Sequence, residues 1–382
     1  MEILLGPPGT GKTETSIRTV EKFLSQGVPP DRIGYFAFTR RANTEAKQRA
    51  MERFNLAPQD LPYFRTLHSL AYSCMGITRS QIMTRKHYET ASEWLKIGTF
   101  FARENDLGPF KDIGYGDKYL ELINIARITR TPLRKIYNAS RVRYKADWRI
   151  LEYVDKGLKH YKTTYGLYDY ADMLLHFVEA DLAPCLEVVI VDEAQDLSAI
   201  QWEMVSLLAQ KAKHVFIAGD DDQAIYRWAG ADIDRFLGLK GKVKVLSQSY
   251  RIPAKHHEMS QKLIQRVLHR FPKTFNPRNE EGYTQWHRHS EAVNIDAGNC
   301  LLLSRTTRGA NQLEEEVRQR GILYRYDASR SSDSKVLQAV VLWEKLRNGQ
   351  RLSLEDVKRV YGQMFLHKQV AILVLVYVRE KF

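Results

Sequence analysis

The segment Gly6-Pro-Pro-Gly-Thr-Gly-Lys-Thr13 constrains the fold of this chain more than any other feature of the sequence. It matches the phosphate-loop pattern G-x-x-x-x-G-K-[S/T], and it lies between a short strand-like run, Glu2 to Leu5, and a helix-forming stretch, Lys12 to Leu24. A loop of this kind follows a β-strand and opens a helix, whose N-terminus helps to bind the phosphate. The sequence therefore predicts an α/β fold with a phosphate site beside a parallel sheet.

The residue types in this loop have direct physical roles. Gly9 and Gly11 allow a turn tight enough for backbone N–H groups to point at phosphate oxygens. Lys12 reaches the β- and γ-phosphates, and the Thr13 hydroxyl can bind Mg²⁺. The predicted nucleotide-binding residues are Gly6, Pro7, Pro8, Gly9, Thr10, Gly11, Lys12 and Thr13.

A second apolar run, Val188 to Val191, ends in two carboxylates, Asp192 and Glu193. After a complete phosphate loop, this pattern is typical of the strand that holds the metal in a nucleotide hydrolase. Asp192 would hold Mg²⁺ through its water shell, and Glu193 would orient and deprotonate the attacking water. A base that activates water favours hydrolysis over transfer to a small acceptor.

The composition indicates a polyanionic partner. The chain has 382 residues, enough for two or three domains, and its 58 Lys and Arg against 45 Asp and Glu give a net charge of +13. Its three cysteines lie far apart, which argues against a disulfide framework or a metal site. The longest apolar run, Val370 to Val378, has nine residues, too few for a membrane span, and the first residues do not form a signal peptide. We therefore expect a cytoplasmic protein without membrane contact.

The pattern of elements changes along the chain. Strand–helix alternation continues with Ile33 to Phe38 and Arg41 to Arg53, and it returns from Glu187 onward. Between Met75 and Thr164 only helical patterns appear. Within this part, the stretch from Arg127 to Lys162 has eleven Lys and Arg and three Asp and Glu, which indicates a basic face. Further elements expected after the last sheet strand are a helix from Pro253 to His269 and a strand from Cys300 to Leu303.

Three later segments identify a family by their order. They are Asp192-Glu-Ala-Gln-Asp196, the run from Gly219 to Ala231, and Gln248-Ser-Tyr-Arg251. Together they closely resemble superfamily 1 DNA helicases of the UvrD/Rep type. Upstream, Phe36 to Ala42 is similar to that family's motif Ia, and Phe64 to Ala71 is similar to its Thr-x-His segment. The resemblance extends over residues 1 to 350.

The resemblance implies a DNA motor that hydrolyses ATP, with Mg²⁺, to move 3′ to 5′ along single-stranded DNA and to open junctions of single and double strands. It implies that Lys12, Glu193, Gln223 and Arg251 are catalytic, with Gln223 sensing the γ-phosphate and Arg251 acting as an arginine finger. Tyr250 would stack on the adenine. The residues that would contact DNA are Phe38, Thr39, Arg40, Thr66, His68 and Trp228.

The resemblance also implies a domain order. Residues 1–75 and 165–247 would form a split RecA-like ATPase domain, with residues 76–164 as a helical insertion. Residues 248–333 would form a second, incomplete RecA-like domain. Residues 334–382 would begin a further helical insertion and end in an atypical tail.

The chain departs from the family pattern at both ends. Only five residues precede Gly6, so the family's adenine-recognising Gln segment is missing, and the late motifs of the second motor domain are not found. We therefore expect a member truncated at its C-terminus. A truncated gene, a fragment completed by a separate partner chain, and a reduced helicase all fit this ending.

Two other classes of function stay open at this point. The chain could bind nucleotide and single-stranded DNA without unwinding, since coupling motifs are missing. A phosphate-loop kinase for a small molecule is the third class, but the segment from Gly219 to Ala231 and the net charge of +13 argue against it.

Overall fold

The chain forms two compact units, Met1–Thr284 and Gln285–Phe382. A computed structural model describes residues 1–38, 40–97, 117–140, 146–295, 299–326, 329–330 and 335–364. Two features of the sequence, Thr39 and the run from Val370 to Val378, lie outside these described residues. The finer domain boundaries expected at 75, 164, 247 and 333 stay predictions.

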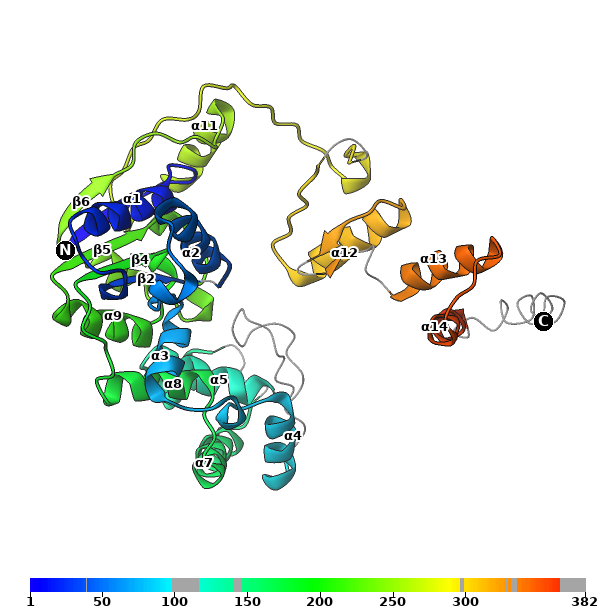
Figure 1. Ribbon diagram of the computed structural model, residues 1–382, viewed down its shortest axis with the longest axis horizontal. Helices are drawn as coiled ribbons and strands as arrows, with labels where there is room; N and C mark the ends of the chain where they lie inside the picture. Colours follow the sequence, from blue (N-terminus) through cyan, green and yellow to red (C-terminus); the bar gives the residue numbers. More distant parts are fainter. Residues whose placement is uncertain are drawn as a thin grey trace. The chain divides into compact units, whose positions relative to one another are not determined.

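The first unit is built on a six-stranded parallel sheet (Figure 1) with strand order β3-β2-β4-β5-β1-β6. The strands are β1 (Glu2–Leu5), β2 (Ile33–Ala37), β3 (Phe64–Arg65), β4 (Val188–Asp192), β5 (His214–Gly219) and β6 (Lys242–Val245). In a parallel sheet the carboxyl ends of the strands meet at one edge, where ligands bind. Gly6, Asp192 and Asp220 therefore gather at this edge. The predicted α/β fold is confirmed.

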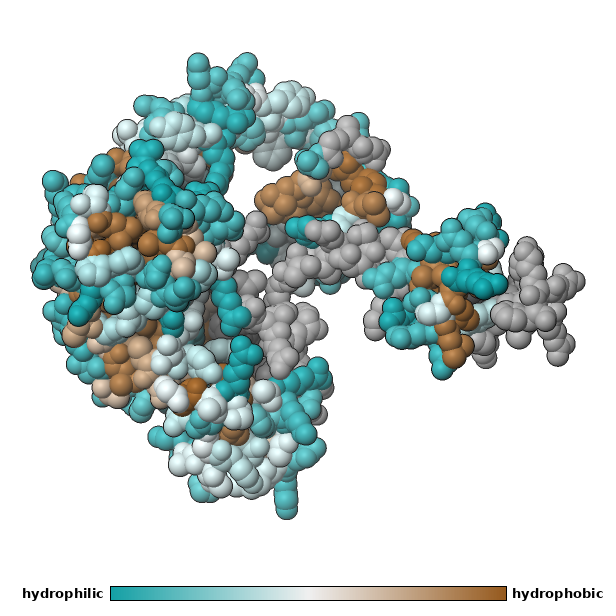
Figure 2. Space-filling model, in the orientation of Figure 1, coloured by the Kyte–Doolittle hydropathy of each residue, from teal (hydrophilic) through white to brown (hydrophobic). Residues whose placement is uncertain are grey.

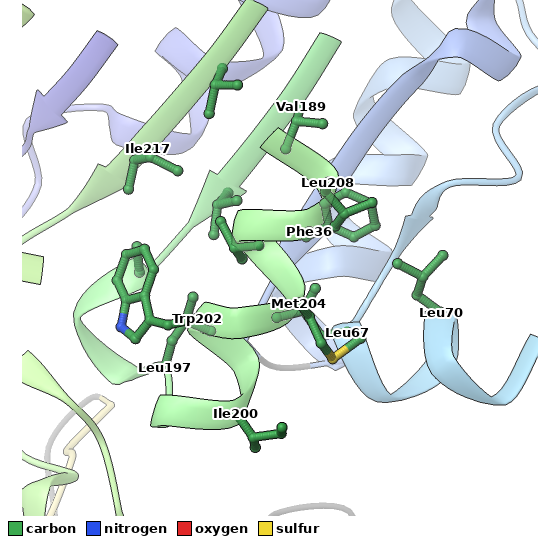
Figure 3. Close-up of a cluster of buried hydrophobic side chains, with 14 of the residues drawn as sticks. Phe36, Leu67, Leu70, Val189, Leu197, Ile200, Trp202, Met204, Leu208 and Ile217 are labelled. Carbon is green, nitrogen blue, oxygen red and sulfur yellow. The ribbon is translucent and has the colours of Figure 1, made fainter. Parts of the chain in front are cut away.

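Helices cover both faces of the sheet, because side chains alternate along each fully buried strand. On one face, Tyr35 and Ile190 share a buried cluster with residues of α1 (Lys12–Ser25) and α2 (Arg40–Phe54). On the other face, Phe36 and Ile217 belong to a cluster with side chains of α9, part of which Figure 3 shows. The helices that contribute to this second cluster are α3 (Leu67–Met75), α8 (Tyr170–Glu179), α9 (Ala199–Lys211) and α10 (Ile233–Leu237).

Local signals set the start of α9 well and the end of α11 less well. Ser198 caps α9 as its spacing predicts, since its backbone N–H donates to Gln201 Oε1 at 2.9 Å. In contrast, α11 (Ala254–Ile264) ends before the predicted His269. The chain beyond α11 leaves the helical path, and Arg270 and Lys273 there contact side chains of a distant turn. Those tertiary contacts compete with helix continuation.

The helices between residues 76 and 164 pack around a buried cluster of their own. These helices are α4 (Arg85–Trp94), α5 (Asp117–Ile128), α6 (Leu133–Ala139) and α7 (Trp148–Tyr165). Leu95, Leu122, Leu151 and Val154 belong to this cluster. The insertion predicted between residues 76 and 164 is therefore helical wherever the structure describes a regular α or β element in it.

A cluster of four charges joins these helices to α8. Lys162 Nζ lies 2.5 Å from Asp169 Oδ2 and 2.6 Å from Asp172 Oδ2, and Arg127 contacts both carboxylates. Burial alone would raise the pKa of Asp169, but the charges of Arg127 and Lys162 outweigh it, so this pKa lies below its usual range. Asp169 also caps α8 by accepting from Asp172 N at 2.8 Å. The acidic segment that precedes β4 thus anchors the insertion.

The second unit has a different character. It contains α12 (Thr307–Gln319), a two-stranded antiparallel sheet of β7 (Arg325–Tyr326) and β8 (Ser329–Arg330), α13 (Lys335–Arg347) and α14 (Leu354–Met364). The strand predicted from Cys300 to Leu303 is wrong, since these residues pair with no strand of the described chain. Leu301 is 82% exposed and Leu303 79%, and Figure 2 shows hydrophobic residues at the surface of this unit. A strand needs a neighbouring strand to pair its backbone N–H and C=O groups. The second RecA-like domain stays a prediction.

Candidate nucleotide-binding site

The loop after β1 has a backbone that requires glycine. Gly9 has φ 72° and Gly11 has φ 84°, both in the left-handed region. A Cβ on Gly9 would lie 2.3 Å from Arg251 Cβ, and a Cβ on Gly6 would lie 1.9 Å from Lys12 Cγ. The pattern of glycines in the loop is therefore needed for both its conformation and its close contacts.

Lys12 begins α1 with its side chain buried against this loop. Its Nζ donates to the Gly6 carbonyl at 2.9 Å and lies 3.7 Å from Glu193 Oε1. The Lys12 side chain is 9% exposed and that of Glu193 is 36% exposed. An ammonium group suited to phosphate and a carboxylate suited to water thus face each other at the edge of the sheet.

Asp192 ends β4, and its carboxylate accepts three hydrogen bonds. Its Oδ2 accepts from the Thr13 hydroxyl at 3.1 Å and from the Tyr35 hydroxyl at 2.7 Å, while its Oδ1 accepts from Glu193 N at 3.0 Å. Burial, followed by the charge of Asp192, raises the pKa of Tyr35 well above its usual value, so Tyr35 remains a donor. Thr13 and Asp192 together offer the oxygen ligands that Mg²⁺ prefers, so the residues present fit this ion.

Glu193 stands at a sharp turn that Gln195 supports. Glu193 has φ 52°, an uncommon conformation for a residue with a side chain. The Gln195 amide nitrogen donates to Glu193 Oε2 at 2.9 Å and to Asp196 Oδ2 at 3.3 Å. Burial, then the charge of Glu193, raises the pKa of Asp196 to about 7, and its Oδ1 has no hydrogen-bond partner among the described residues. A carboxyl group with a raised pKa, that of Asp196, therefore lies beside Glu193 near the phosphate loop.

Gln223 closes a turn after β5, the strand between β4 and β1. Its side-chain amide donates to Asp220 Oδ2, and the Asp220 N–H donates to Gln195 Oε1 at 3.0 Å. One hydrogen-bonded network therefore links Gln223, through Asp220 and Gln195, to Glu193.

The segment with Tyr250 and Arg251 lies against the phosphate loop. The Tyr250 N–H donates to the Gly9 carbonyl at 2.9 Å, and the Ser249 hydroxyl donates to the Pro8 carbonyl at 2.8 Å. The Tyr250 side chain is largely exposed, at 74% for the residue. The structure thus brings both residues to the loop that the sequence assigned to the same nucleotide. Stacking on adenine and the arginine-finger role stay predictions.

Two of the predicted DNA contacts follow neighbouring parts of the same sheet edge. Phe38 comes directly after β2, and its ring centroid lies 5.6 Å from that of Tyr226. Trp228 lies in the short helix Arg227–Ala229 of the same loop as Tyr226 and is 64% exposed. Arg40 begins α2 on the chain that follows Phe38.

Thr66 and His68 lie at the start of α3. Thr66 caps this helix, because its hydroxyl oxygen accepts from Ser69 N at 3.2 Å. The His68 ring packs edge-on against Tyr170, with centroids 5.9 Å apart. Burial, followed by the charge of Arg40, lowers the pKa of His68 to about 4, so its imidazole is neutral at pH 7.

Several residues of the site carry no assigned role in the sequence. They are Tyr35, Gln195, Ser249 and Lys273. Tyr35 is a polar residue in a strand that is otherwise apolar, and Gln195 lies inside the Asp192–Asp196 segment. Both features of the sequence could have marked these residues as part of the site. No such feature marks Lys273, because its partners belong to a different part of the chain.

The fold and the phosphate loop define a RecA-like P-loop domain. A parallel sheet places a phosphate loop and the carboxylates of Asp192 and Glu193 at one edge. A family model, described as the UvrD/REP helicase N-terminal domain, matches residues 2–244. The chain therefore belongs to the UvrD/REP helicase family.

Curated relatives agree with this assignment. The chain is 25% identical to the ATP-dependent DNA helicase PcrA of Bacillus subtilis, over 73% of this chain and 39% of PcrA. It is 27% identical to DNA helicase II of Haemophilus influenzae, over 49% of this chain and 30% of that protein. It is 24% identical to the ATP-dependent DNA helicase Rep of Buchnera aphidicola, over 71% of this chain and 42% of Rep. The matched parts are less than half of each relative.

Within the part of the chain that the structure describes, no helix combines the length and the apolar character that crossing a bilayer needs.

Proposed function

We propose that this chain is the nucleotide-driven part of a DNA helicase that hydrolyses ATP to move 3′ to 5′ along single-stranded DNA. One observation carries the proposal: Lys12, Thr13, Asp192 and Glu193 meet at the carboxyl edge of the sheet, with Thr13 Oγ1 3.1 Å from Asp192 and Lys12 Nζ 3.7 Å from Glu193. The relatives, which are named as helicases, favour unwinding over binding alone.

Hydrolysis would use five residues of this chain. Lys12 would bind the β- and γ-phosphates, and Glu193 would accept a proton from the attacking water. Thr13 and Asp192 would hold Mg²⁺, which neutralises charge on the phosphate oxygens when bound. Arg251 would stabilise the negative charge of the transition state. The contact of Ser249 and Tyr250 with the phosphate loop supports this role for Arg251.

Movement on DNA would use the exposed aromatic side chains. Bases stacked on Trp228 and Phe38 would be held without regard to sequence, at about 1–3 kcal/mol per base. Gln223 would report the γ-phosphate to this loop, since only four residues separate it from Trp228 in the chain. The substrate would be single-stranded DNA and its junctions with duplex. A second polypeptide that carries the family's late motifs is the proposed protein partner.

The first test is ATP hydrolysis by the 382-residue chain with and without single-stranded DNA. We expect stimulation by DNA, and we expect Lys12→Ala and Glu193→Gln to lose turnover. Glu187→Gln and Lys213→Ala are matched controls, because these residues form an exposed ion pair with each other. Hydrolysis that survives in Lys12→Ala would contradict the assignment of the site.

A second test separates movement from binding. Duplexes with a 3′ or a 5′ single-stranded tail are offered with ATP, and displacement of the labelled strand is measured. We expect displacement from the 3′-tailed duplex alone. Stimulated hydrolysis without displacement from either duplex would mean that this chain binds and hydrolyses but needs a partner to unwind.

A further inference from the structure

Lys273 is a buried cation surrounded by three carboxylates. Its Nζ lies 3.2 Å from Asp220 Oδ1, 2.5 Å from Asp221 Oδ1 and 3.0 Å from Asp222 Oδ2. The side chain of Lys273 is 1% exposed, and those of Asp220 and Asp221 are 0% and 1% exposed. A lysine is rarely buried to this degree unless it is paired, so the contact defines the position of the turn.

Two residues near Lys273 also bind these aspartates. Arg270 makes a two-pronged contact with Asp222, with Nε 2.7 Å from Oδ1 and a terminal nitrogen 2.5 Å from Oδ2. The Phe271 N–H donates to Asp221 Oδ2 at 2.9 Å. All three aspartates after β5 are therefore bound by the segment 270–273.

The turn that is held in this way carries the proposed sensor. The Gln223 amide donates to Asp220 Oδ2, and Lys273 contacts the other oxygen of the same carboxylate. The Asp220 N–H reaches Glu193 through Gln195. Lys273 is thus one residue removed from Gln223 and two removed from the proposed base.

The other end of the same segment holds the phosphate loop. Ser249 N donates to the Asn276 carbonyl at 2.9 Å, and Asn276 N donates to the Ser247 carbonyl at 2.7 Å. Ser249 in turn donates to Pro8 of the loop. Residues 247–249 and 270–276 therefore form one connected body that contacts the phosphate loop at one place and the sensor turn at another.

We propose that Lys273 is a positioning residue that ties the Gln223 turn to the segment carrying Tyr250 and Arg251, so that the sensor and the phosphate loop respond together to the γ-phosphate. This inference rests on the proposed function, because Gln223 senses a γ-phosphate only if the chain uses ATP. Lys273 itself touches no nucleotide in this account, and its effect passes through Asp220.

The test measures how strongly the chain prefers ATPγS to ADP, both with Mg²⁺, by fluorescence titration. The variants are Lys273→Met, Gln223→Ala and the two combined, with Lys273→Arg as the conservative change. Lys213→Met, in an exposed ion pair, is the matched control. Because Lys273→Met leaves carboxylates unpaired and could unfold the chain, Lys273→Met with Asp221→Asn keeps the net charge of the cluster.

We expect Lys273→Met and Gln223→Ala each to reduce the preference about tenfold, the factor that matches loss of one charge-assisted hydrogen bond. The combined variant should lose no more than either alone, since the two residues act as a unit. Lys273→Arg should restore part of the preference, and ADP binding should change less than about twofold. Additive losses, or an unchanged preference in the charge-balanced variant, would overturn the inference. Equal binding of both nucleotides by the unmodified chain would instead contradict the proposed function.

Discussion

Tyr35→Phe removes the hydroxyl group that donates to Asp192, the carboxylate proposed to hold Mg²⁺, and changes little else. The Tyr35 hydroxyl donates to Asp192 Oδ2 at 2.7 Å, and both residues are buried. The ring stacks on Phe64 with centroids 5.4 Å apart, and a phenylalanine ring would keep this contact. The change therefore isolates the hydrogen bond from the packing of the core.

The magnitude follows from the charge of the acceptor. A hydrogen bond to a charged group contributes about 1.5–3 kcal/mol, and Asp192 would keep its contacts with Thr13 and with Glu193 N. We expect the free energy of unfolding to fall by about 2 kcal/mol. We also expect weaker Mg²⁺-dependent nucleotide binding, because Asp192 loses the group that orients its Oδ2.

The pH dependence gives a second check with a definite sign. The raised pKa of Tyr35 means that the native state keeps its proton where an unfolded tyrosine loses it, above pH of about 10. The stability that this group contributes is thus complete below about pH 10 and falls as pH rises further. Tyr35→Phe should lack this alkaline loss, and its effect should be constant between about pH 6 and 9.

The assay is urea unfolding, with nucleotide titrations at several Mg²⁺ concentrations beside it. Tyr153→Phe is the matched control, because its hydroxyl makes a contact of 3.3 Å to the Leu95 carbonyl in the helical insertion. We expect the control to leave Mg²⁺ dependence unchanged. The reasoning would be refuted if Tyr35→Phe lost less stability than Tyr153→Phe, or if Mg²⁺ dependence were the same in both.

Two further predictions concern the same edge of the sheet. Asp196→Asn should raise the melting temperature at pH 8, where the buried carboxylate of the native state is charged. The gain should shrink as pH falls from 7 toward 4, because the raised pKa lets the native state take up a proton before the unfolded state does. Thermal unfolding at pH 5 and 8 checks this prediction, and an equal gain at both pH values would count against it. Gly9→Ala should lower stability by about 1–2 kcal/mol because of its left-handed backbone alone, and by more because the new Cβ would lie 2.3 Å from Arg251 Cβ. Urea unfolding and nucleotide binding check this prediction. Gly27→Ala is the control, because Gly27 has φ 84° and open space around it, so this change brings the backbone strain without the contact.

The sequence predicted the parts of this protein whose chemistry is local. The phosphate loop works through consecutive residues, so Gly6 to Thr13 could be assigned before any fold was known. The strand that ends at Asp192 and the cap at Ser198 are local in the same sense. Periodicity was a poorer guide from Cys300 to Leu303, where an apolar run forms no strand, because strand formation depends on a neighbour that the run itself does not contain.

The order of residues in the sequence predicted neither the path of the chain around the site nor the polar contacts that this path creates. Tyr35 reaches Asp192 because β2 and β4 are neighbours in register, with Ala37 opposite Asp192. Lys273 reaches Asp220 because the segment beyond α11 returns to the end of β5. No spacing in the sequence predicts either pair, since each joins residues that are distant in the chain and are buried side by side only in the fold. Residue types set which chemistry the sheet edge can hold, and strand order and burial set which carboxylates share a donor, because a buried charge is stable only where the fold brings it a partner.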